Sequence, residues 1–198
     1  MERLEDTTVA GTEDGLIDSA SSDYVDGITA QWGRERPDLD VWPMDIIGRI
    51  RRLASLLNKR NEEVWARFGL HGGLFDVLAA LRRAGPPYRL SPTELYNSLL
   101  MSSGAMTHRL ARLTTEGLIV RVPDTHDGRS LLVELTEKGH EAINLSVEAF
   151  LEAGYETLSG LEDEDRNDLT ALLRKLLLGL GDTGMPEFSD DSMVTDRL

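Results

Sequence analysis

The 198-residue sequence contains no cysteine. A disulfide bond, a thiolate metal site and a catalytic or sensing thiol are therefore excluded. The chain also lacks any apolar run near the roughly 18 residues that mark a membrane-spanning helix, and its first 20 residues are acidic and polar, unlike an export signal. We therefore expect a cytoplasmic protein that has no membrane partner.

Positive charge is scarce, because 21 Lys and Arg face 35 Asp and Glu for a net charge of -14. Such a balance argues against a nucleic-acid partner, since neutralising phosphate is a large part of DNA affinity. The excess lies at the ends, however: residues 1–45 carry 12 acids against three arginines, and residues 182–198 carry five against one. The 136 residues between them carry a net charge of only -1. We expect residues 1–20 and 182–198 to be disordered acidic tails.

Motifs of enzymes are missing as well. The sequence has no G-x-S-x-G, no phosphate-binding glycine loop and no H-E-x-x-H, and its four histidines do not have the spacing of metal ligands. We therefore expect neither an enzyme nor a resident cofactor or metal.

Apolar periodicity predicts a mostly α-helical chain with one hairpin. Ser91-Pro-Thr-Glu94 is a capping box that opens a short helix, and the helix that begins near residue 103 ends at Gly117. Residues 118–139 then form two short apolar strands around a polar tip, and Thr136 opens the next helix. The expected helices cover residues 23–33, 43–68, 74–84, 91–100, 103–116, 137–158 and 161–180.

Two short helices followed by a β-ribbon form a winged helix-turn-helix, whose second helix enters the DNA major groove. Residues 102–114 suit this role, because they contain two arginines and no acid. Placing Met106, Leu110 and Leu113 on the core side turns Arg109 toward the boundary with the rest of the protein. The pattern alone favours solvated helix charges for the arginines, but a ribbon tipped by Arg129 favours DNA. The candidate groove residues are Ser103, Gly104, Thr107, His108, Ala111 and Arg112.

The hairpin sequence R-V-P-D-x-x-D-x-R, from Arg121 to Arg129, followed by L-T-x-K-G up to Gly139, resembles the wing of the MarR family of transcription regulators. The likeness extends over about residues 40–181. It implies that Asp127 orients Arg129 toward the minor groove or a phosphate. It also implies a repressor that binds a pseudo-palindromic operator in double-stranded DNA, associated with the nucleoid when bound.

The same resemblance implies one domain over residues 21–181 and a homodimer. Helices of residues 23–85 would precede the winged helix of 86–136, and helices of 137–181 would serve dimerisation. The leucine-rich last helix supports a homodimer independently, because one small core cannot bury all of its apolar surface.

Residues 26–44 resemble the extra first helix of the urate-responsive and aconitate-responsive regulators of this family. The likeness implies a small anionic effector, held by Trp32, Asp76, Arg109 and Arg121. From the pattern alone, Trp32 is more typical of a core residue and Asp76 of a solvated charge. The sequence does not distinguish urate from an aconitate- or citrate-type carboxylate.

Two other functions stay open. A metal-responsive regulator of this family could bind zinc through His and Asp without cysteine. A winged helix can also serve only as a protein-interaction module.

Overall fold

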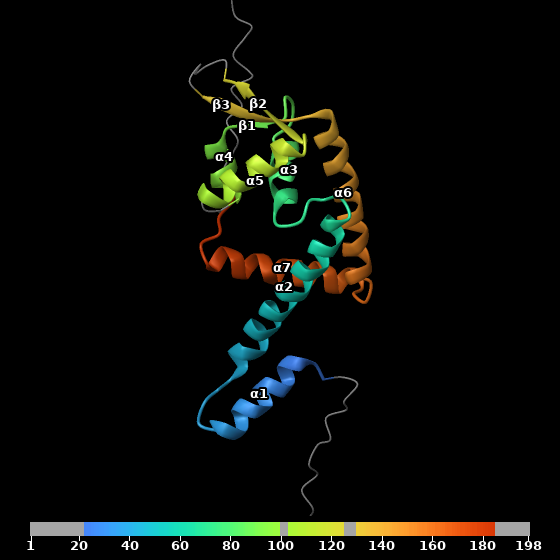
Figure 1. Cartoon of the computed structure of the whole chain (residues 1–198). Coiled ribbons are helices and arrows are strands. Elements are labelled where there is room, and N and C mark those ends of the chain that lie inside the picture. Colours follow the sequence, from blue (N-terminus) through green and yellow to red (C-terminus); the bar gives the residue numbers. More distant parts are fainter. Residues whose placement is uncertain (1–21, 100–102, 125–129, 185–198) are drawn as a thin grey trace, which may run out of the picture. The chain divides into compact units, whose positions relative to one another are not determined.

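The computed structural model describes residues 22–99, 103–124 and 130–184. The chain forms two compact units, Met1–Leu57 and Asn58–Leu198, and the long helix α2 contributes to both. A mostly helical fold with a small sheet is confirmed, and each predicted helix is present. In chain order, the elements are α1 (Tyr24–Glu35), α2 (Trp42–Ala66), α3 (Leu74–Arg83), β1 (Arg89–Leu90), α4 (Pro92–Leu99), α5 (Ser103–Thr115), β2 (Ile119–Pro123), β3 (Leu131–Leu135), α6 (Glu137–Thr157) and α7 (Asp163–Gly179) (Figure 1).

Helix α1, in the first unit, begins with a capping box. The Asp23 carboxylate accepts the backbone N–H groups of Val25 at 2.7 Å and of Asp26 at 3.1 Å. The Asp26 carboxylate in turn accepts the backbone N–H of Asp23 at 2.8 Å. Both acids satisfy donors that a helix start leaves unpaired, and they place negative charge at the positive end of the helix dipole.

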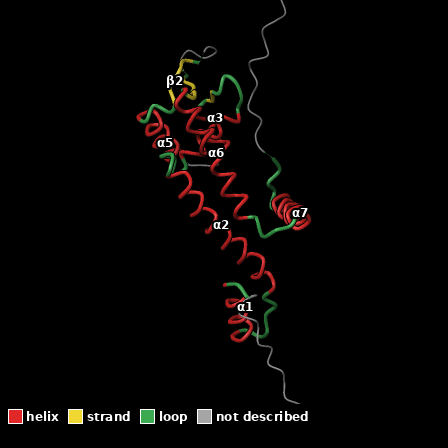
Figure 2. Tube along the Cα trace, turned by 90° about the vertical axis from the view of Figure 1, so that its right-hand side faces the viewer, coloured by secondary structure: helices red, strands yellow, loops and turns green. Residues whose placement is uncertain are grey.

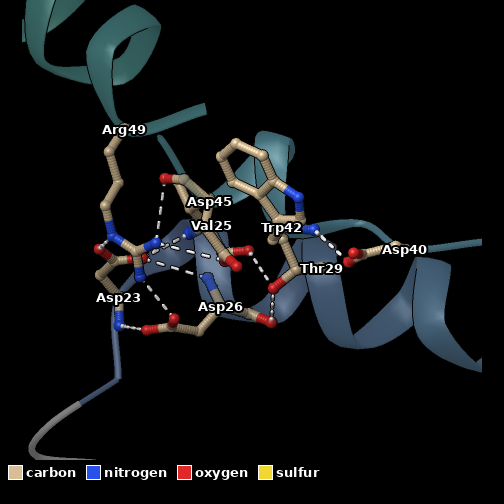
Figure 3. Close-up of polar contacts among 8 residues, drawn as sticks. All are labelled: Asp23, Val25, Asp26, Thr29, Asp40, Trp42, Asp45 and Arg49. Carbon is tan, nitrogen blue, oxygen red and sulfur yellow. Dashed lines mark hydrogen bonds and ion pairs between the residues drawn. The ribbon is translucent and has the colours of Figure 1, made fainter. Parts of the chain in front are cut away.

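Arg49 of α2 fastens this first turn of α1 (Figure 3). Its Nε donates to Asp23 at 2.9 Å and its Nη2 to Asp26 at 2.5 Å. Each capping carboxylate therefore accepts hydrogen bonds both from the helix backbone and from Arg49. The backbone N–H of Asp23 and the Arg49 guanidinium hold the pKa of the Asp26 carboxyl below its ordinary value. Beside them, Val25 is 3% exposed, and a Cβ on Gly48 would lie 2.9 Å from its Cγ1. The absence of a side chain at position 48 thus allows the two helices to approach.

The core of the second unit surrounds α3. Every residue from Leu74 to Leu81 is buried except Asp76. Helices α4, α5 and α6 and strand β3 pack against α3, and Figure 2 shows α3, α5 and α6 gathered next to β2. The ring of Trp65, near the end of α2, stacks on Phe75 with 4.6 Å between centroids. This stacking ties the end of α2 to α3.

The hairpin carries a third strand that the sequence did not reveal. Strand β3 lies between β2 and β1, and all pairings are antiparallel. Ile119 of β2 pairs with Leu135, and Arg89 of β1 pairs with Glu134, to which it also forms an ion pair of 2.8 Å. The prediction of a two-stranded ribbon was therefore wrong. A strand of two residues is too short to show the alternation by which strands are recognised.

Thr136 is the N-cap residue of helix α6, and its N–H donates to the carbonyl of Leu118, just before the wing, at 3.2 Å. The Thr136 hydroxyl accepts the N–H of Gly139 at 3.0 Å and donates to the Gly117 carbonyl at 2.7 Å. A methyl group on Gly139 would overlap the backbone carbonyl of Leu118. Helix α6 can therefore lie directly against Leu118, the residue before β2, only because residue 139 is glycine.

Helix α7 has the predicted amphipathic pattern but buries none of its residues. Its leucines are an apolar face that the chain itself leaves uncovered, and such a face usually marks an interaction surface. The leucines of this face are Leu169, Leu172, Leu173, Leu176 and Leu177, which are between 41% and 61% exposed, and Leu180 at 85%.

Candidate nucleic-acid interface and effector site

Helix α5 presents the predicted groove face. Met106, Leu110 and Leu113 are 3%, 2% and 0% exposed, so the predicted core side of the helix is confirmed. Helix α4 packs against α5, as in a helix-turn-helix. Ser103 is the first residue of α5, and the exposed residues of the opposite face are Gly104, Thr107, His108 and Ala111.

Arg112 lies at the margin of this face and is half-buried. Its Nε donates to Glu116 Oε1 at 2.9 Å, and its Nη2 donates to His71 Nε2 at 3.0 Å. Because a guanidinium only donates, His71 is the acceptor of this hydrogen bond. Sequence reasoning named neither partner. The spacing of four residues could have indicated Glu116, whereas His71 lies 41 positions away.

Strands β2 and β3 form the wing. At the end of its described part, the Asp124 N–H donates to the Ser130 carbonyl at 3.0 Å. The predicted tip residues Asp127 and Arg129 lie outside the described residues. Arg121 is exposed on β2, opposite Val133 in the register.

Asp76 of α3 and Arg109 of α5 lie close enough for their charges to interact. Both are half-buried, so Asp76 is not the fully solvated charge that the pattern alone favours. Burial raises the pKa of the Asp76 carboxyl above its ordinary value and Glu62 adds to the rise, whereas the charges of Arg109 and Arg83 oppose it. Arg121 is not among the charges that act on this carboxyl.

Trp32 belongs to α1, in the first unit, and is 44% exposed. The pattern alone favoured a core position, and that interpretation is wrong. Val25, in the first turn, is the residue of α1 that is buried.

Among the described residues, no group of three or more His, Asp or Glu side chains could hold a metal ion. The same residues include no helix that is long and apolar enough to cross a membrane. The chemistry that the arrangement offers is thus a groove face without acids and an arginine beside a carboxyl that burial makes less acidic.

Residues 68–130 match the sequence model of the MarR family. Over 152 residues the chain is 39% identical to the HTH-type transcriptional regulator PecS of Dickeya dadantii, an alignment that covers 77% of this chain and 92% of PecS.

Solved structures show the same fold. A mutant MarR from E. coli, complexed with operator DNA, matches with a TM-score of 0.56 and 26% identity over 70% of this chain and 99% of that one. Sco5413, a MarR family transcriptional regulator from Streptomyces coelicolor, matches with a TM-score of 0.62 and 23% identity over 72% of this chain and 98% of its own. These relatives are transcription regulators and not enzymes.

Proposed function

Because this chain belongs to the MarR family of DNA-binding transcriptional regulators, we propose that it is a homodimeric repressor whose affinity for a pseudo-palindromic operator falls when a small anionic metabolite binds. The observation that carries the proposal is the position of Arg109. The helix that presents the groove face also holds this arginine beside Asp76. A ligand that engages Arg109 therefore acts on the recognition helix directly.

The proposed DNA contacts lie on α5 and at the wing tip. No acid occurs in α5, so its exposed small and polar residues can approach the major groove without repelling phosphate. Arg112, at the margin of the face, supplies a cation for a phosphate. Arg129, oriented by Asp127, is proposed to reach the adjacent minor groove or a phosphate.

The proposed effector residues are Trp32, Asp76, Arg109 and Arg121. Arginine donors suit a carboxylate or a planar anion, and a tryptophan ring offers a stacking surface. An anion that binds Arg109 competes with the Asp76 carboxylate for the same positive charge. Operator release requires that the anion bind more tightly to the conformation that does not fit DNA.

The homodimer is supported by α7. A helix that buries nothing in its own chain, but carries five leucines on one face with Leu180 just beyond its end, gains most from a second copy of the same surface. Two-fold symmetry of this kind also matches the two halves of a pseudo-palindrome.

A titration of labelled duplex from the region upstream of the gene tests the assignment of roles. Arg112→Ala and Arg129→Ala should each weaken binding about tenfold and lower the salt slope by about one, as expected for one lost phosphate contact. Arg109→Ala should leave DNA affinity within a fewfold of wild type but blunt the ligand response. The reverse order of effects would refute these roles.

Thermal shift with urate, aconitate and citrate tests the effector class, because a ligand at 100 times its Kd stabilises the folded state by about 2.7 kcal/mol. No shift with any anion would remove the effector half of the proposal and leave DNA binding standing. Altered DNA binding after dialysis against a chelator would favour a metal-responsive regulator instead. Failure to retard any upstream fragment would favour a protein-interaction module.

A further inference from the structure

The turn between α2 and α3 contains His71, Gly72 and Gly73, which together we call the 71–73 turn. Gly72 and Gly73 adopt left-handed backbone conformations, with φ of +68° and +78°. The Gly72 N–H donates to Glu62 Oε2 at 2.9 Å, which ties the turn back to α2. The N–H of Phe75 donates to the Leu70 carbonyl at 3.1 Å, which ties the other side to α3. The turn is thus held from both of its helices.

Arg109 of α5 lies directly on this turn. Gly73 is buried, and a methyl group built on it would overlap Cζ and both terminal nitrogens of the Arg109 guanidinium. The guanidinium therefore occupies the space that a side chain at position 73 would take. Asp76, in the first turn of α3, adds its negative charge from the same region.

Arg112, nearly one helical turn further along α5, rests on the same turn through its hydrogen bond to His71. Two arginines of one helix thus contact one three-residue segment, one through its backbone and one through a side chain. Sequence reasoning missed this arrangement, because His71 and Gly73 belong to no periodic pattern.

We propose that the 71–73 turn sets the position of the recognition helix, with Gly73 and His71 as positioning residues for DNA binding. The turn itself does not enter the groove: it fixes α5 through Arg109 on Gly73 and Arg112 on His71. A methyl group at position 73 forces the Arg109 guanidinium off the turn, so α5 loses this one of its two contacts with the turn. The inference rests on the proposed role of α5 as the recognition helix.

The test compares Gly73→Ala with Gly72→Ala. Alanine carries a similar backbone cost at both sites, because both have left-handed φ. A methyl group on Gly72 meets nothing within 4 Å, however, whereas one on Gly73 strikes Arg109. Affinity is measured with a fluorescent upstream duplex of about 30 bp, long enough for two half-sites one helical turn apart.

Gly73→Ala should weaken DNA binding about threefold more than Gly72→Ala, a loss no larger than that caused by removing Arg109, while the two variants melt at similar temperatures. In an Arg109→Ala background, which removes the clash, the two substitutions should have equal effects. An equal loss for both variants in the wild-type background would overturn the proposal. A Gly73→Ala effect that persists without Arg109 would overturn it too.

The proposed role of His71 in positioning Arg112 has its own test, which does not depend on whether Gly73→Ala folds. Gln places an acceptor near the position of Nε2, so His71→Gln should bind DNA within about twofold of wild type, whereas His71→Leu should bind several times more weakly. Equal binding by both variants would show that Arg112 is not held through His71. Because wild type is the reference in every arm, failure of wild type to bind the duplex would instead refute the proposed function.

Discussion

Leu176→Ala on α7 tests the proposed homodimer quantitatively. Leu176 is 46% exposed in the single chain. Complete burial of a leucine stabilises by about 1.5–3 kcal/mol, so covering the exposed half contributes about 1 kcal/mol per copy. Because a two-fold interface contains each residue twice, the substitution should weaken the dimer by about 2 kcal/mol. The dimer Kd should therefore rise roughly thirtyfold.

Leu178→Ala is the matched control. Leu178 lies on the same helix and is 54% exposed, but the helical wheel places it opposite the leucine face. Analytical ultracentrifugation across micromolar concentrations measures both variants. An equal effect of the two substitutions would show that the leucine face is not the interface. A wild-type chain that sediments only as a 22.0 kDa species would refute the dimer itself.

Two further predictions concern Arg49 and Asp76. Arg49→Ala should release the first turn of α1 and speed amide hydrogen exchange in that helix, because both capping carboxylates lose their cation. The control is Arg51→Ala, since Arg51 is exposed on the same helix as Arg49. Unchanged exchange in Arg49→Ala would show that Arg49 does not hold α1. Asp76→Asn should raise Tm at neutral pH, because burial disfavours the ionised carboxyl. The gain should not exceed about 1 kcal/mol, since water screens a half-exposed group. The gain should shrink as the pH falls through the raised pKa and disappear below the ordinary pKa that Asp76 has in the unfolded chain, so melting curves at neutral pH and at acidic pH test the sign.

Helix order and type followed from local rules. Apolar spacing placed α2, α3 and the last helices, and the Ser91–Glu94 box placed the start of α4, where the structure shows both reciprocal hydrogen bonds. Apolar spacing and capping boxes involve residues that are only one or two helical turns apart. They can therefore be recognised in the sequence alone. Strand β1 was missed because its two residues become a strand only by pairing with β3, which is more than 40 positions away in the chain.

The face of α5 that is proposed to enter the groove could also be predicted from the sequence. The contacts that hold α5 against the 71–73 turn could not. A helical wheel turns Met106, Leu110 and Leu113 to the core and leaves Arg109 at the boundary, because the angle between residues on one helix is fixed. The contact of Arg109 with Gly73 joins two elements, and no spacing predicts it. The half-burial of Asp76 is similar, since its own helix alone suggests a solvated position.

By itself, the sequence determined which segments are helical, which face of each helix is apolar and where the acidic charge lies, because these properties depend on neighbours along the chain. The tertiary structure decided that Arg109 and Arg112 rest on one turn, that burial raises the pKa of Asp76, and that α7 leaves its leucines uncovered in the chain. Burial and contact depend on which distant segments share a core, so they emerge only when the chain has folded.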